Sequence, residues 1–135
     1  MHAQPLLILL SVVVGTAVLS SCRSEERTRG PWRTGGVYSI RSGQGGFGVV
    51  KVLAVDPGVV SIRIYKQKYG ERPSTVDPAT LTLGSLHDPD GFGIGHAPVA
   101  EARFASWEPH LLFVQSVSED ELEGYRIWKE DSAGK

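Results

Sequence analysis

The chain has one cysteine, Cys22, among its 135 residues, so no disulfide can form within it. It also lacks an apolar run of the ~20 residues that cross a bilayer as a helix. A GxSxG motif and zinc-ligand spacing are absent, so we predict no catalytic residue, metal site or cofactor. No basic stretch with interleaved aromatic residues occurs. We therefore expect no nucleic-acid partner.

The first 22 residues follow the pattern of an export signal. Residues 6–19 are uncharged and mostly apolar, with the length of a signal-peptide hydrophobic region, roughly 7–15 residues. Leu19-Ser20-Ser21-Cys22 then gives an apolar residue, two small residues and a cysteine. This motif resembles the lipobox of bacterial lipoprotein precursors. One departure is that residues 1–5 contain no Lys or Arg. The alternatives are an uncleaved anchor, or a buried helix with a chance cysteine.

The resemblance implies removal of residues 1–21 as a signal peptide and attachment of a lipid to Cys22. The protein is then expected in the bacterial cell envelope, bound to the membrane through its N-terminal lipid, with its domain outside the cytoplasm. Residues 22–34 are rich in charge and poor in aliphatic side chains, which is typical of a flexible tether. Trp32 is expected to be the first residue that docks on the domain, the alternative being a position at the membrane interface.

Charge is divided unevenly along the mature chain. Residues 23–87 carry 10 basic and 5 acidic side chains, whereas residues 88–135 carry 4 basic and 10 acidic ones. Such a division can produce a dipolar surface that steers a charged partner. We favour the simpler interpretation that the two halves fold together and neutralise each other.

Residues 35–66 have the pattern of a β-sheet. Residues 37–41 alternate as a half-buried strand does, and residues 47–55 are dense in β-branched side chains. Asp56-Pro57-Gly58-Val59 predicts a type II turn that leads into a strand over residues 59–66. In that strand Val60, Ile62 and Ile64 are expected on one face, and Ser61, Arg63 and Tyr65 on the other.

The loop between the first two strands invites a different interpretation. Residues 43–50, GQGGFGVV, fit the pattern GxGxFGxV and resemble the phosphate-covering loop of protein kinases, with Lys66 near the place of the phosphate-pairing lysine. The catalytic and metal-binding motifs of kinases do not follow. We therefore interpret residues 43–48 as a structural loop with glycines at positive φ.

The remaining residues predict short elements. Asp77-Pro78 is typical of a helix start, and residues 81–83 alternate briefly as a strand does. Residues 87–91 combine a histidine with two carboxylates, but the calcium-loop spacing is wrong, so we predict a solvated turn. The other predicted elements are a helix over 99–107 opened by Pro98, a strand over 111–117, and a helix from the capping box 118–121 to about 130.

Together these patterns predict an α+β domain over residues 35–131, with a frayed tail at 132–135. We expect a small curled antiparallel sheet or barrel with a short helix and a C-terminal helix packed on it. Residues 35–66 loosely resemble small Tudor-like barrels in architecture.

The expected function is that of a non-catalytic envelope protein that binds another protein or supports the envelope. Its candidate contact surface comprises Arg63, Tyr65, Lys66 and Tyr69. The alternative for this surface is that these are ordinary solvent-facing residues of a strand. The alternative is a small exported enzyme or ligand binder that uses His96 and His110 with nearby carboxylates.

Overall fold

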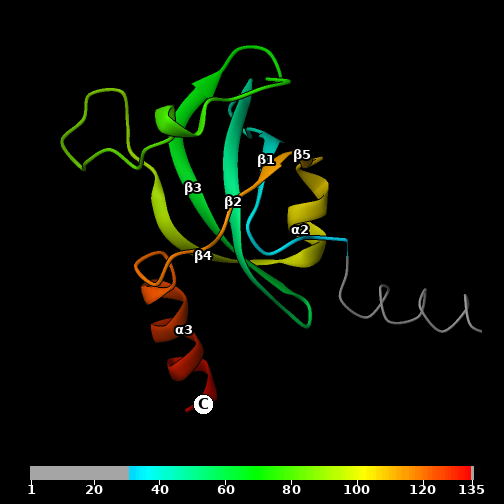
Figure 1. Cartoon of the computed structure of the whole chain (residues 1–135), viewed down its shortest axis with the longest axis vertical. Coiled ribbons are helices and arrows are strands. Elements are labelled where there is room, and N and C mark those ends of the chain that lie inside the picture. Colours follow the sequence, from blue (N-terminus) through cyan, green and yellow to red (C-terminus); the bar gives the residue numbers. More distant parts are fainter. Residues whose placement is uncertain (1–30, 135) are drawn as a thin grey trace, which may run out of the picture. The chain divides into compact units, whose positions relative to one another are not determined.

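The computed structural model describes residues 31–134, in which five antiparallel strands form one open sheet in the order β4-β3-β2-β1-β5 (Figure 1). The predicted signal peptide and the lipidation site Cys22 lie outside the described residues. The strands are β1 (Gly36–Arg41), β2 (Phe47–Asp56), β3 (Val59–Tyr69), β4 (Ile94–Ala100) and β5 (His110–Val114). A 3₁₀ turn η1 (Pro78–Thr80) and the helices α2 (Glu101–Ser106) and α3 (Glu123–Ala133) complete the fold.

The predicted hairpin forms the centre of the sheet. β2 and β3 pair antiparallel from Asp56↔Val59 to Phe47↔Tyr69. Gly58 has a φ of +76°, the conformation that the third position of a type II turn requires and that glycine adopts without steric cost. The turn and the start of each strand are therefore confirmed.

One face of the sheet carries the larger hydrophobic core. β-branched and aromatic side chains of β1, β2 and β3 meet Phe104 of α2, which is fully buried. Trp32 packs on the same face, with ring centroids 4.8 Å from Phe104 and 6.0 Å from Tyr38. The docking of Trp32 is confirmed. We call this side of the sheet the α2 face.

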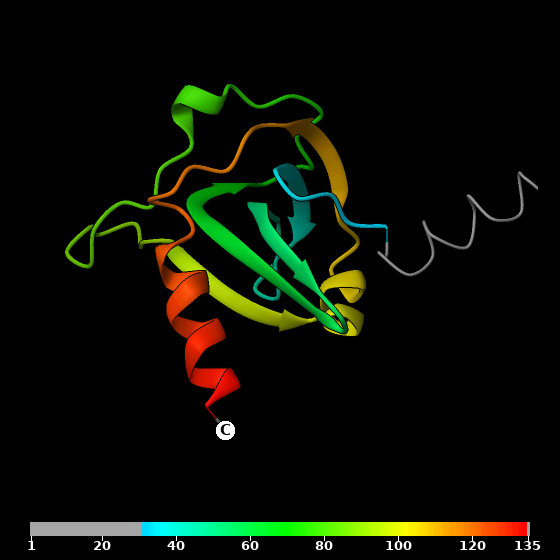
Figure 2. The ribbon, with the colours of Figure 1, turned by 60° about the horizontal axis from the view of Figure 1, so that its bottom comes forward.

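The opposite face of the sheet is covered by irregular segments rather than by a long helix. Val37, Val49 and Tyr65 form its buried centre, and side chains of residues 76–83 pack against them. Residues 115–122, here called the strap, cross this face from β5 toward α3 (Figure 2). Lys51, in the middle of β2, is only 1% exposed and donates to the Ser116 carbonyl at 2.8 Å and to Glu121 at 3.0 Å. We call this side the strap face.

The sheet does not close. β4 and β5 lie at its two edges, so the expected curled sheet or barrel is wrong, whereas the α+β class and the antiparallel pairing are confirmed. A barrel needs its first and last strands to pair. Here α2 directly follows β4 and returns the chain along the α2 face to the opposite edge, where β5 adds beside β1.

The short helix begins later than predicted. Pro98 and Val99 belong to β4, and α2 starts at Glu101. A proline fits an edge strand because its missing N–H can face away from the ladder. Residues 81–83 form no regular strand, although the Thr82 carbonyl accepts from the Lys66 amide at 2.9 Å.

Two N-terminal caps form as the sequence predicts. Asp77 accepts a hydrogen bond from the Ala79 amide at 3.0 Å, which caps η1 as predicted. The capping box also forms: the Ser118 amide donates to Glu121 at 3.0 Å, and the Glu121 amide donates to Ser118 at 3.3 Å. The box closes a turn, and α3 itself begins at Glu123.

The ion pairs connect the basic first half of the mature chain with its acidic second half. In the part of the chain that the structure describes, every ion pair except Arg126–Glu119 joins a residue of 23–87 to a residue of 88–135. The joining pairs are Arg41–Glu108, Lys51–Glu121, Arg63–Glu121, Lys66–Asp88, Lys66–Asp90 and Lys129–Asp56. The interpretation that the halves neutralise each other is therefore confirmed.

Candidate functional site

The four residues of the predicted contact surface do not share one exposed face. Tyr65 is only 7% exposed and belongs to the core of the strap face, so it is not available to a partner. Arg63 lies 3.9 Å from Glu121 of the strap. Lys66 and Tyr69 remain together, because both line a groove beside the end of β3.

A projecting loop, residues 82–93, forms one side of this groove. One end is fixed to β3, and the two ends are joined to each other. The Lys66 amide donates to the Thr82 carbonyl at 2.9 Å, and the Gly93 amide donates to the Leu83 carbonyl at 2.7 Å. Gln67 adds two side-chain hydrogen bonds to Thr82, at 2.8 and 2.9 Å. A Cβ at Gly93 would lie 2.1 Å from the Ile64 carbonyl oxygen, so only glycine permits this close approach.

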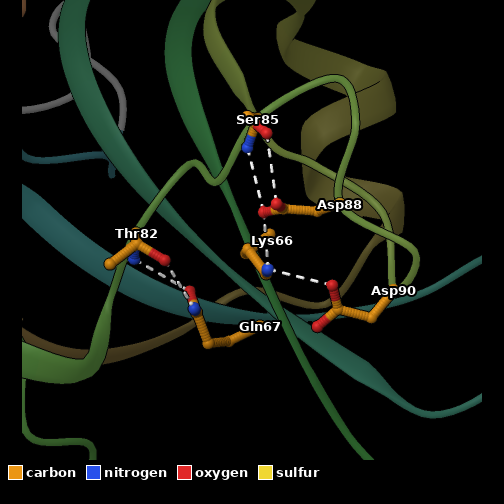
Figure 3. A network of polar contacts seen from close by, with 6 residues as sticks. All are labelled: Lys66, Gln67, Thr82, Ser85, Asp88 and Asp90. Carbon is orange, nitrogen blue, oxygen red and sulfur yellow. Dashed lines mark hydrogen bonds and ion pairs between the residues drawn. The ribbon is translucent and has the colours of Figure 1, made fainter.

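An ion-pair network holds the interior of the loop. Lys66 donates to Asp88 at 2.9 Å and to Asp90 at 3.0 Å, while the Ser85 amide donates to Asp88 at 3.0 Å (Figure 3). The hydrogen bond from Lys66, followed by those from Ser85, lowers the pKa of Asp88 to about 2. Asp88 therefore stays ionised at neutral pH and holds the loop in one shape.

The groove between this loop and β3 has a volume of about 530 Å³. Its lining comprises Lys66, Gln67, Lys68, Tyr69, Thr80 and Asp90. Lys68 is exposed and belongs to none of the ion pairs within residues 31–134. Outside the lining of the groove, the same loop exposes Leu86 by 74% and Phe92 by 52%. The site therefore combines an exposed cation on β3 with two exposed apolar side chains on a braced loop.

The loop should respond to acid in a defined direction. Because the folded pKa of Asp88 is lowered to about 2, its stabilising effect is present above the unfolded pKa of ~3.9 and is lost as the pH falls from about 4 to 2. We expect the protection of the Gly93 amide, the ratio of its intrinsic to its observed exchange rate, to fall over that range. Asp88→Asn should show fast exchange already at neutral pH. Unchanged exchange in Asp88→Asn would show that the ion pair does not hold the loop.

The two histidines of the alternative function lie on opposite edges of the sheet. His96 is on β4 and His110 on β5. The Nε2 atom of His96 lies 3.1 Å from the Ser61 hydroxyl, and its ring packs against Tyr125 and Trp128 of α3. Burial lowers the pKa of His96. The histidines therefore do not form a shared site, and His96 helps to seat α3.

The glycine-rich loop is a tight turn. Gly45 and Gly46 have φ values of +90° and +73°, and the Ser42 amide donates to the Gly46 carbonyl at 3.0 Å. A Cβ at Gly46 would meet the Tyr69 carbonyl oxygen at 2.6 Å. Lys66, the lysine of the kinase-like pattern, is occupied by the acidic loop. These contacts favour the structural interpretation of residues 43–48.

Comparisons of the chain with protein-family models, with curated proteins and with solved structures found no match. Within residues 31–134, no group of three or more potential metal-ligating side chains comes together. No helix in the same range is long and apolar enough to cross a membrane.

Two features of the site were missed by the sequence interpretation. Asp88 and Asp90 were interpreted as residues of a solvated turn, yet they bind Lys66 from 22 and 24 positions away. The exposure of Leu86 and Phe92 on this loop was not predicted either. The sequence did contain a signal for a tightly turned loop. Glycines lie at positions 84, 91 and 93, and clustered glycines are typical of tight turns and of close backbone approach.

Proposed function

We propose that this chain is a lipid-anchored protein of the bacterial envelope whose folded domain is a non-catalytic protein-binding module. The observation that carries the proposal is the motif Leu19-Ser20-Ser21-Cys22, which contains the only cysteine of the chain and follows an uncharged apolar segment. A single thiol in an exported protein requires an explanation, and lipid attachment supplies one.

The domain supports the binding half of the proposal through the groove and the 82–93 loop. Lys68 supplies a positive charge, and Leu86 and Phe92 supply apolar contact area on a loop that Lys66 already holds in place. A preformed loop loses less conformational entropy on binding than a mobile one. The chemistry fits a protein segment with an apolar side chain next to a carboxylate.

The anchor is tested by Cys22→Ser. Lipid attachment requires the cysteine thiol, so we expect the wild-type chain in bacteria to incorporate a labelled fatty acid and the variant to incorporate none. The variant should also leave the membrane fraction. The readout is radiolabel or click-label on the immunoprecipitated chain. An unlabelled wild-type chain contradicts the anchor.

The binding surface is tested with the full chain, extracted from membranes in mild detergent and used as bait. Phe92→Ser and Lys68→Glu should both lose a polypeptide that the wild type captures, because one removes apolar area and the other reverses the charge. Ile127→Ser is the matched control, since Ile127 on α3 is 57% exposed, against 52% for Phe92. Equal capture by all four proteins contradicts this surface.

The alternative of an enzyme or ligand binder has less support. His96 contacts Ser61 and two aromatic rings of α3, and His110 lies at the other edge of the sheet. A general base needs an acceptor and a substrate within hydrogen-bonding reach. We therefore retain the binding module as the proposed function.

A further inference from the structure

The two edges of the open sheet differ in how well they are protected. At one edge, β4 contains Pro98, and α3 packs beside it through Tyr125 and Trp128, which meet His96. Proline and a covering helix are two of the devices that prevent edge strands from pairing with other chains. β4 is therefore a blocked edge.

At the other edge, β5 has neither device, and its only irregularity is a register shift against β1 between Val37 and Tyr38. Its sequence HLLFV contains no proline, lysine or acidic residue. In the described part of the chain, β5 pairs only with β1, and its far side has no strand partner. Leu111 and Val114 are 47% and 54% exposed. An exposed apolar edge strand of this kind is a template for a further strand.

We propose that the occupant of this edge is β5 of a second copy of the chain, paired antiparallel so that two sheets become one. Two antiparallel copies of the same strand are related by a two-fold axis, which gives a closed dimer. A parallel arrangement of the same edge would not close. The pairing would cover Leu111 and Val114 in both copies at once.

The point where the chain enters the domain favours a second copy. Trp32 packs on the α2 face. A two-fold axis perpendicular to a sheet keeps the same face of both copies on the same side, so Trp32 of both copies lies on one side of the dimer. That is the arrangement that two anchors in one membrane require, and this step depends on the anchor at Cys22 proposed above.

The size of the edge sets the expected strength. β5 has only five residues, so the pairing adds few hydrogen bonds and is expected to be weak between freely diffusing chains. Confinement to a membrane raises the effective concentration of a second copy. The dimer is therefore expected on the membrane, rather than after dilution in detergent.

The test uses the full chain in living bacteria, with a photo-crosslinking amino acid at Val114 and two co-expressed tags. We expect a product of twice the chain mass that carries both tags. The same crosslinker at Ile127 of α3, which is 57% exposed against 54% for Val114, is the control and should give little of this product. Leu111→Lys places like charges on the pairing edge of both copies, and we expect about a tenfold lower yield, equivalent to ~1.4 kcal/mol.

Three results would overturn the proposal: no doubly tagged product at Val114, a Val114 product that contains only another protein, or an equal dimer yield at Ile127. An unchanged yield in Leu111→Lys would overturn it as well. The anchor is tested separately by fatty-acid labelling. A labelled chain without the dimer therefore refutes the pairing alone, and a dimer of an unlabelled chain refutes the anchor alone.

Discussion

Glu121→Ala should destabilise the domain by about 3–5 kcal/mol, because it leaves the ammonium group of Lys51 buried without its counter-ion. Lys51 is 1% exposed and donates to Glu121 at 3.0 Å. Its remaining partner is the neutral carbonyl of Ser116. The measurement is urea unfolding of the purified protein, followed by tryptophan fluorescence.

Two controls separate the charge pair from the capping box that also contains Glu121. Ser118→Ala removes the hydroxyl that the Glu121 amide uses but leaves the ion pair, and should cost about 0.5–2 kcal/mol. Lys51→Met keeps an unbranched side chain of similar length and removes the buried charge, and should cost less than Glu121→Ala. If Ser118→Ala costs as much as Glu121→Ala, the buried pair is not the cause.

The ionisation of Glu121 also makes the stability of the domain depend on pH in a defined direction. Burial by itself raises the pKa of Glu121, but hydrogen bonds from the Ser118 amide and from Lys51 outweigh it, so the net pKa is lowered. The stabilisation is therefore present above the unfolded pKa of ~4.3 and is lost as the pH falls through the lower folded value.

Ile62→Ala should destabilise the domain by about 2–5 kcal/mol, through lost transfer free energy and the cavity that remains. Ile62 is fully buried in the core of the α2 face. Lys68→Ala, at an exposed position of the same strand, should change stability by no more than about 0.5 kcal/mol. Equal effects at both positions would show that the inward face of β3 is assigned wrongly.

Ser61, next to Ile62, is not the neutral control that strand alternation predicts. It is 0% exposed, and its hydroxyl lies 3.1 Å from Nε2 of His96. Ser61→Ala leaves a half-buried ring nitrogen without this contact, so we expect a loss of about 1–3 kcal/mol. Alternation predicts two faces correctly, but it assumes that one of them meets water. Here both faces are covered, one by α2 and Trp32 and the other by the strap.

Local patterns were enough for the central part of the fold. The turn at Gly58 and the cap at Asp77 depend on residues a few positions apart, so the sequence specifies them directly. β4 was missed because Pro98 followed by alanines is also typical of a helix start, and only its place at a sheet edge decides between the two.

The buried pair could not have been predicted in the same way. Lys51 stands in an apolar run, where a lone charge is normally assigned to the solvent side. Its partners are 65 and 70 positions later in the chain, and no local period links them. Sequence alone therefore predicted a strand at Lys51 and the capping box at Glu121, but not their contact.

The long separation between Lys51 and the strap has a consequence for the order of folding. The three-strand meander is local and can form early, but it then presents a lysine in the middle of an apolar surface until residues 116–121 arrive. Closing so long a loop is slow compared with forming a hairpin. We therefore expect the strap to dock after the meander has formed, and we expect the chain to be more open to proteolysis until it does.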